Sequence, residues 1–205
     1  MEDVGLAPGH AHATAGTGVP DGKLGIWIFL ASEVMFFAGL IGSYIVLRFG
    51  TARWPVPSET LNIPLTGFNT FLLICSSVTM VKALSAAHRD DQAGIRKFLG
   101  ATVGLGCVFL SIQAYEYYSL SHHAHGPYTN GFLPWSDIFG STFYTMTGFH
   151  GAHVTGGVIW LGIILLGALQ GRFGSRNYMP IELAGLYWHF VDLVWIILFT
   201  IVYLV

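Results

Sequence analysis

The segment Trp188-His189-Phe190-Val191-Asp192-Leu193-Val194-Trp195 lies in an apolar run that begins near residue 182 and continues to Val205. A run of this length can cross a bilayer, because a hydrocarbon core of about 30 Å needs about 20 helical residues. A charged residue at the centre of such a helix costs from about 2.5 kcal/mol upwards. His189 and Asp192 stand three residues apart on one helical face, so we expect each to have a partner or a function.

Four more apolar segments precede this one, and together they predict an all-α integral membrane protein, a bundle of five transmembrane helices. The segments cover residues 24–49, 67–88, 95–120, 140–171 and 182–205. Their apolar residues are continuous rather than alternating, which favours helices over a β-barrel. Residues 1–22 are rich in Gly, Ala, Thr, His and Pro, and they predict a disordered tail ahead of a membrane domain at 23–205.

The composition agrees with a membrane protein and argues against a nucleic-acid partner. Of the 205 residues, 53% are hydrophobic and 10% are charged, whereas soluble domains carry about 25% charged residues. The net charge is -2 and the few basic residues form no patch. Cys75 and Cys107 fall inside predicted spans, where we expect small apolar packing residues rather than a disulfide. No cleavable signal peptide is expected.

Basic residues divide the two sides of the predicted bundle. The side of the tail holds Lys23, Arg89, Arg96, Lys97, Arg172 and Arg176, and the other side holds Arg48 and Arg53. The positive-inside rule therefore predicts a cytoplasmic N-terminus and an outside C-terminus. Small residues within the spans predict close approach of helices, in this chain or from a partner. They gather at Ala38, Gly39 and Gly42, at Gly100, Gly104 and Gly106, and at Gly148, Gly151, Ala152, Gly156 and Gly157.

Ionisable residues inside the spans are the candidates for function. Glu33, in the first span, is either a proton-accepting or binding group or the partner in a structural hydrogen bond between helices. His150 and His153 stand three residues apart, so both are expected on one face of the fourth span. With His189 and with Glu33 or Asp192 they could form a metal site of imidazole and carboxylate ligands. The alternative is that each histidine hydrogen-bonds a carboxylate or a carbonyl.

Two further groups of polar residues lie near the outer end of the third span. Glu116 stands among tyrosines in Gln113-Ala114-Tyr115-Glu116-Tyr117-Tyr118, where it could pair with a histidine of a neighbouring helix. The loop His122-His123-Ala124-His125 resembles a chelator, although short His-rich loops are weak evidence. No P-loop, dinucleotide fingerprint, nucleophile elbow or haem-attachment motif occurs, so no catalytic residue is predicted in this chain.

Four segments in order resemble subunit III of the haem–copper respiratory oxidases, over almost the whole membrane part of the chain. The first is Ser32-Glu33-Val34-Met35-Phe36-Phe37, and the second is Gln113 to Tyr118. The third comprises Gly140-Ser141-Thr142-Phe143 and Thr147-Gly148-Phe149-His150-Gly151-Ala152-His153-Val154, and the fourth is Tyr187 to Trp195. Four such segments at the family's intervals are far more specific than any one of them.

The resemblance implies a non-redox core subunit of a proton-pumping oxidase that reduces dioxygen to water. Haem and copper would reside in subunits I and II, and this chain would bind no metal or cofactor except phospholipid. It would stabilise subunit I, contact subunit II and small subunits, and support proton uptake in the bacterial inner membrane. Glu33 would face subunit I, and hydrogen-bond networks would hold the bundle through Glu116, His150, His153, His189 and Asp192. Lipid or subunit contacts are expected at Trp27, Phe36, Phe37, Trp188 and Trp195.

The chain departs from the longest members of this family, which have seven helices with two ahead of the glutamate helix. The lipid cleft formed by those two helices is therefore expected to be completed by another subunit or by lipid. Five-helix forms are typical of many bacterial members, in both the cytochrome c and the quinol branches. Cytochrome c oxidase is the preferred prediction. The alternatives are a quinol oxidase, an accessory subunit of a nitric-oxide reductase and, more remotely, an independent transporter or membrane metalloenzyme.

Overall fold

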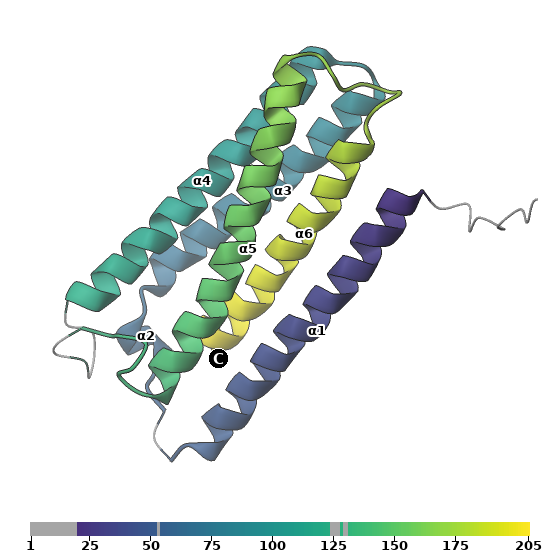
Figure 1. Cartoon of the computed structure of the whole chain (residues 1–205). Helices are drawn as coiled ribbons and strands as arrows, with labels where there is room; N and C mark the ends of the chain where they lie inside the picture. The colour runs from purple at the N-terminus through teal and green to yellow at the C-terminus, as the bar shows by residue number, and fades with distance from the viewer. Residues whose placement is uncertain (1–19, 53, 124–127, 129–130) are drawn as a thin grey trace, which may run out of the picture.

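A computed structural model of the chain describes residues 20–52, 54–123, 128 and 131–205. The predicted disordered tail, apart from its last residues, lies outside this range. Within it, the regular elements are helical (Figure 1). They are α1 (Asp21–Gly50), α2 (Pro57–Thr60), α3 (Ile63–His88), α4 (Gln92–His122), α5 (Ile138–Leu169), α6 (Met179–Phe199) and a π-helical turn, η1 (Thr200–Leu204). Among the described residues, five helices are long and apolar enough to cross a membrane, which confirms the predicted number.

Most of the long helices begin a few residues before the predicted spans. In α3, α4 and α5 the first turn is capped by a side chain of the residue that precedes the helix. The cap of α3 is Asn62, whose side chain accepts from the Leu65 N–H, and Asp91 and Asp137 accept in the same way from Gly94 and Gly140. Such caps satisfy backbone donors that have no partner within the helix. The apolar run shows where the chain can enter the bilayer, whereas the cap determines where the helix begins.

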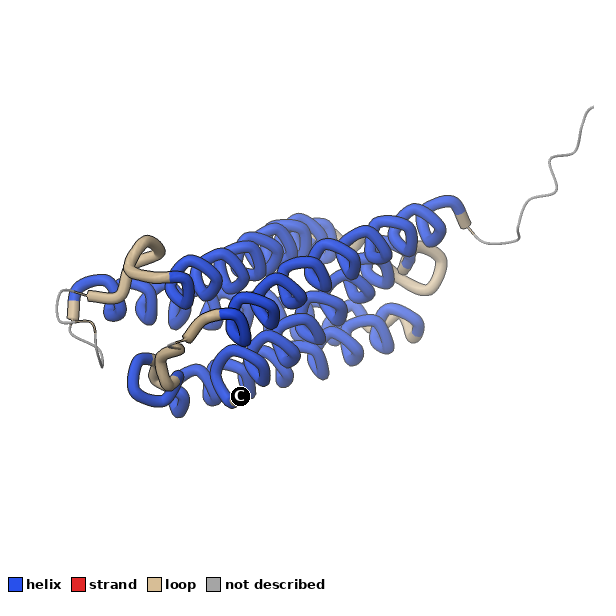
Figure 2. Tube along the Cα trace, turned by 90° about the horizontal axis from the view of Figure 1, so that it is seen from below, coloured by secondary structure: helices blue, strands red, loops and turns tan. Residues whose placement is uncertain are grey.

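Four of the long helices form a ring and the fifth lies outside it. Helices α3, α4, α5 and α6 each contact the next, and α6 closes the ring against α3. Helix α1 lies beside α5 and α6 (Figures 1 and 2). Only Phe37 and Tyr44 are buried among the residues of α1. This helix therefore presents most of its apolar surface to its surroundings.

The centre of the ring is built around two tryptophans of α6. Trp188 and Trp195 are each 1% exposed. Their indole N–H groups donate to hydroxyl oxygens of α3, Trp188 to Ser76 and Trp195 to Thr70, both at 2.9 Å. Buried indoles need such acceptors, and α3 supplies both. The expectation that these two rings contact lipid or another subunit is therefore wrong.

The other three aromatic residues predicted at such contacts differ in their exposure. Phe37 is buried, with 3% of its surface exposed, because its ring packs edge-on to the imidazole of His153 at 5.1 Å. The prediction of an external contact is therefore also wrong for Phe37. Trp27 and Phe36 are 60% and 38% exposed, so both remain available on the surface of α1.

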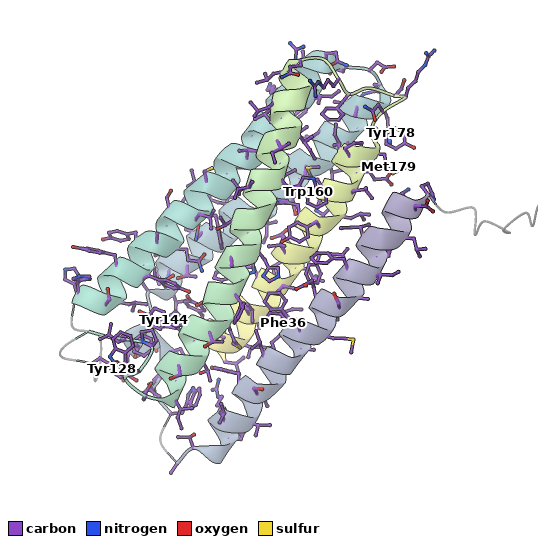
Figure 3. All side chains as sticks on the ribbon, viewed as in Figure 1. Phe36, Tyr128, Tyr144, Trp160, Tyr178 and Met179 are labelled. Carbon is purple, nitrogen blue, oxygen red and sulfur yellow. The ribbon has the colours of Figure 1, made fainter. Side chains whose placement is uncertain are left out.

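One end of the bundle carries most of the positive charge, and we refer to it as the basic end. It comprises the start of α1, the α3–α4 connection and the α5–α6 connection, with Tyr178 and Met179 at the start of α6 (Figure 3). The two connections are joined, because Asp90 accepts from the backbone N–H and the hydroxyl of Ser175, each at 2.6 Å. These hydrogen bonds hold the pKa of Asp90 below its ordinary value.

The opposite end carries Arg48, which donates to the backbone carbonyl of Val205 and so joins α1 to the end of the chain. Trp54 packs edge-on against Tyr44 and Phe139, both at 5.4 Å, so this ring is half-buried in the bundle. Among the described residues, the basic side chains thus divide between the two ends of the bundle as the sequence predicts.

Candidate functional site

The carboxyl of Glu33 and the imidazole of His153 form a pair between α1 and α5. Glu33 Oε2 lies 2.9 Å from His153 Nε2, and His153 Nδ1 lies 2.7 Å from the carbonyl of Phe149. A carbonyl only accepts, so the hydrogen on this ring's Nδ1 is assigned by its partner. Nε2 then either accepts from a protonated carboxyl or donates, as imidazolium, to a carboxylate. One proton therefore lies between Oε2 and Nε2 in either state.

Aromatic rings pack against the imidazole of this pair. Phe37 lies edge-on to His153, and the rings of Phe36 and His153 are 6.2 Å apart. Phe36, which is labelled on α1 in Figure 3, also packs edge-on against Phe149 of α5 at 5.1 Å. The side chains of Glu33 and His153 are 17% and 19% exposed. Such an apolar setting favours a hydrogen-bonded pair that is neutral overall.

A second group joins α3 and α6 through a hydroxyl. Ser77 Oγ lies 2.6 Å from Asp192 Oδ2 and 3.0 Å from His189 Nδ1. His189 and Asp192 thus share one helical face, as predicted, and the hydroxyl of a third residue connects them. Ser77 was not identified from the sequence. The signal was a pair of serines, Ser76-Ser77, in the middle of an apolar span, where each hydroxyl now binds a side chain of α6.

Glu116 is a third buried acid, and its partners are hydroxyls rather than a histidine. Thr66 Oγ1 lies 2.8 Å from Glu116 Oε1, and the hydroxyl of Tyr203 lies 3.4 Å from both carboxyl oxygens. The suggested pairing with a histidine is therefore wrong. Only 4% of Glu116 is exposed. Its contacts connect α3, α4 and η1 near the end opposite the basic end.

His150 and His153 point to different neighbours, although the spacing predicted a common face. His150 is fully buried inside the ring, where it stacks on Trp195 at 4.7 Å and lies edge-on to Phe109 at 5.9 Å. Neither of its ring nitrogens has a hydrogen-bond partner among the described residues. Residues three apart on a helix differ by about 60° in direction. Because α1 lies outside the ring, this angle is enough to direct one histidine inward and the other to α1.

The arrangement does not assemble the metal site that was the alternative interpretation. Within the described ranges, no three His, Cys, Asp or Glu residues lie close enough to hold an ion. His153 is paired with Glu33, and His189 with Ser77 and Asp192. In the loop after α4, His122 stacks on Tyr118 at 4.4 Å, and His125 lies outside the described residues. The buried acids and imidazoles are distributed among separate partners.

These contacts bring the four segments of the resemblance together. The first and third meet where Glu33 contacts His153. The second and third meet where Gln113 donates to the carbonyl of Thr147 at 3.0 Å, and where the hydroxyls of Tyr117 and Thr147 lie 2.6 Å apart. The fourth meets the third where Trp195 stacks on His150, and it binds α3 through its tryptophans and Asp192.

Comparison with known proteins identifies the family of this chain. The family model described as cytochrome c oxidase subunit III matches residues 6–205. The chain belongs to the cytochrome c oxidase subunit III family. It is similar to cytochrome c oxidase subunit 3 of Synechocystis sp., with 40% identity over 96% of this chain and 81% of that protein. The protein of the same name from Thermostichus vulcanus is 37% identical over 97% of this chain and 92% of its own length.

Membership of the subunit III family confirms the resemblance found in the four segments. A third relative, cytochrome c oxidase subunit 3 of Corynebacterium diphtheriae, is 38% identical over 89% of this chain and 87% of its own length. The chain is therefore a subunit III of cytochrome c oxidase, a respiratory oxidase complex with further subunits. Its five apolar helices and these bacterial relatives indicate a multi-pass membrane protein.

Proposed function

We propose that this subunit III is a non-redox component of a proton-pumping cytochrome c oxidase that reduces dioxygen to water. Haem and copper would be held by subunits I and II, and this chain would stabilise subunit I, retain phospholipid and support proton uptake. The observation that carries the proposal is the pairing of acids and imidazoles within the apolar helices, as in Glu33–His153 and Asp192–Ser77–His189. Polar side chains that hydrogen-bond one another in this way hold helices together in the bilayer core, where no water is available as a partner.

The surface of α1 is the proposed contact with subunit I. Trp27 and Phe36 are exposed on this helix, and a Cβ added at Gly39 or Gly42 would meet nothing within 4 Å. Small residues let the backbone of a partner helix approach closely, and aromatic rings add contact area. The Glu33–His153 pair would orient α1 on the ring and thereby position this surface.

A groove between α1 and α5 is the proposed phospholipid contact. It has a volume of about 170 Å³ and lies toward the end opposite the basic end. Its hydroxyl-bearing lining residues are Ser43, Ser141, Thr142 and Thr145. Each of these hydroxyls donates to a backbone carbonyl, which leaves the oxygen lone pairs as acceptors. Such a groove suits a phospholipid whose headgroup carries N–H or O–H donors, because these can bind the hydroxyl oxygens while the acyl chains lie along the apolar helices.

The basic end would face the cytoplasm, following the positive-inside rule. Lys23, Arg89 and Arg172 all lie at this end. This orientation would place the N-terminal tail in the cytoplasm and Val205 at the outer surface of the bacterial inner membrane. Proton uptake would then be supported from the side that carries these cations.

Purification in mild detergent through a tag on this chain tests the proposal. Co-purification of a haem-bearing subunit I and a copper-bearing subunit II is expected, with haem absorbance unchanged in Glu33→Ala complexes that assemble fully. Mass spectrometry of the same sample should detect phospholipid that detergent washing removes slowly. Recovery of the chain alone, or with a tightly bound metal of its own, would contradict the proposal.

A further inference from the structure

The group formed by Asp192, Ser77 and His189 lies at the inner end of a groove between α3 and α6. The groove has a volume of about 150 Å³. Its lining includes Met80 and Leu84 of α3 and Glu182, Gly185, Leu186 and His189 of α6. The positions from Glu182 to His189 span about 10 Å of helix, at about 1.5 Å per residue. The groove thus runs from the basic end to the imidazole.

Charged groups border the outer part of this groove. Glu182 Oε1 forms a 2.7 Å ion pair with Lys23 of α1, and Glu182 Oε2 has no partner in the described part of the chain. From α5, His153 faces Glu33 and His150 faces Trp195, so these imidazoles are directed elsewhere. The volume is sufficient for several water molecules beside this carboxylate.

The inner part of the groove ends on a hydroxyl bridge whose hydrogens can be counted. Ser77 has one hydroxyl hydrogen and two close partners, Asp192 Oδ2 and His189 Nδ1. If Ser77 donates to Nδ1, then Asp192 must donate to Ser77 and is a neutral acid. If Ser77 donates to Asp192, then Nδ1 must carry hydrogen and donate to Ser77. Both arrangements give Ser77 Oγ, Asp192 Oδ2 and His189 Nδ1 a hydrogen-bond partner, and they differ in the positions of the hydrogens between these three atoms.

Asp192 is 7% exposed, and its second oxygen, Oδ1, has no hydrogen-bond partner among the described residues. His189 is only partly buried, and it lines the groove. Since Nδ1 faces Ser77, Nε2 is the nitrogen that remains to meet the groove. The acid is thus enclosed, and the imidazole lies between it and the space that leads to Glu182.

We propose that Asp192, Ser77 and His189 form a proton-binding relay that is loaded from the basic end through this groove. A proton arriving from water or hydronium in the groove forms a bond with His189 Nε2. The Nδ1–H bond breaks as its proton passes to Ser77 Oγ, and the Ser77 hydroxyl proton passes to Asp192 Oδ2. The carboxylate becomes a carboxylic acid, the imidazole remains neutral with its hydrogen now on Nε2, and Ser77 is unchanged. Release follows the same steps in reverse.

Infrared spectroscopy of the purified oxidase complex tests the relay. The difference spectrum between the wild-type and Asp192→Asn complexes should contain the C=O stretch of a protonated carboxyl, which shifts in D₂O. The rate of that shift reports proton exchange at Asp192. Ser77→Ala removes the bridge and should slow exchange by about tenfold or more, since the transfer loses at least one hydrogen bond. Ser77→Thr retains the hydroxyl and should restore the rate.

The controls separate the relay from a structural role of the same residues. Ser111→Ala is the matched control, because the Ser111 hydroxyl donates to the Cys107 carbonyl of its own helix. It should leave the exchange rate unchanged. Leu186→Trp narrows the groove without altering the bridge and should also slow exchange.

Three results would overturn the relay: a difference spectrum that has no carboxyl band at any pH tested, equal exchange in Ser77→Ala and wild type, or slow exchange in Ser77→Thr. If Asp192→Asn prevents assembly, the comparison of Ser77→Ala with Ser77→Thr decides alone. The relay goes beyond the proposed function, and its failure would leave co-purification with haem-bearing and copper-bearing subunits unaffected. The two proposals therefore fail separately.

Discussion

Replacing Gly106 by alanine is expected to loosen the helical ring, because this glycine leaves room for the buried indole of Trp188. A Cβ at position 106 would lie 2.8 Å from Trp188 Cη2 and 2.8 Å from Val158 Cγ2. Carbon atoms are in optimal contact at about 3.5–4.0 Å, so a displacement of about 0.7 Å or more is needed. The indole cannot give way easily. The adjacent edge of the same ring meets Gly157 closely, and the hydroxyl of Ser76 accepts from the indole N–H at 2.9 Å.

The magnitude follows from two opposing effects. Overpacking of a close-packed core costs about 1–3 kcal/mol, and the upper part of this range applies because two groups are contacted and one is a clamped ring. Alanine is favoured over glycine in a helix by up to about 1 kcal/mol. The net loss in the free energy of unfolding is therefore expected to be about 2 kcal/mol. It should appear as a lower temperature for release of this chain from the purified complex.

Gly104→Ala is the matched control, two residues away on the same helix. A Cβ there would meet nothing within 4 Å, so this variant should be neutral or slightly stabilising. Combining Gly106→Ala with Trp188→Phe, which removes the contacted ring atom, should recover part of the Gly106→Ala loss. Equal stability of Gly106→Ala and Gly104→Ala would refute the reasoning that the indole is clamped.

Three other variants test the polar contacts. Glu33→Ala leaves an imidazole nitrogen unpaired and should cost about 1–3 kcal/mol of assembly free energy, measured as faster dissociation of the chain in detergent. Thr66→Val removes the 2.8 Å partner of Glu116 and should lower the thermal midpoint by a similar free energy, measured on the complex. Asp90→Asn removes an acid-dependent contact with Ser175. Because the folded-state pKa of Asp90 is lowered by these hydrogen bonds, its stabilisation is present above the ordinary value of 3.8 and is lost as pH falls through the folded value. Thermal midpoints measured above and below that pH should therefore differ less in the variant.

Each of these variants has a control or a contradicting result. Glu33→Gln can still hydrogen-bond the imidazole, so a loss equal to that of Glu33→Ala would contradict the unpaired imidazole nitrogen as its cause. Thr155→Val serves as the control for Thr66→Val, because the Thr155 hydroxyl donates only to the Gly151 carbonyl of its own helix in the described contacts. Similar losses in the two would contradict a role for Glu116. For Asp90→Asn, an acid response identical to that of the wild type would contradict the assigned contact. Asparagine tolerates the left-handed backbone at this position, where φ is 56°.

The number of helices could be predicted because each span is a long, continuous apolar run. The starts of the helices could be predicted less well, since Asn62, Asp91 and Asp137 cap residues that lie outside these runs. The functional candidates were identified by a physical argument that does not need the fold. An acid or an imidazole in an apolar span must have a partner, and Glu33, His189 and Asp192 each have one.

Partner identity could not be predicted, because it depends on which helices are neighbours. The exclusion of α1 from the ring directs His153 to Glu33, and it leaves His150 stacked on Trp195 rather than in a hydrogen-bond network. The dependence on neighbouring helices also explains why the predicted lipid or subunit contact of Trp188 and Trp195 is wrong. Tryptophan in a membrane span suits an exposed surface as well as a core, and here two hydroxyls of α3 accept from the indole N–H groups in the core.

The amino-acid sequence by itself indicated five helices long and apolar enough to cross a membrane, a resemblance to subunit III, and ionisable groups inside these helices. These properties depend on composition, on run length and on the order of short segments, all of which are local along the chain. The tertiary structure alone decided which acid meets which base, that Ser77 joins Asp192 to His189, and that a groove leads to them from the basic end. The residues in these contacts are far apart in the sequence, as Ser77 and Asp192 are with a separation of 115 positions. The contacts therefore exist only after the helices have packed.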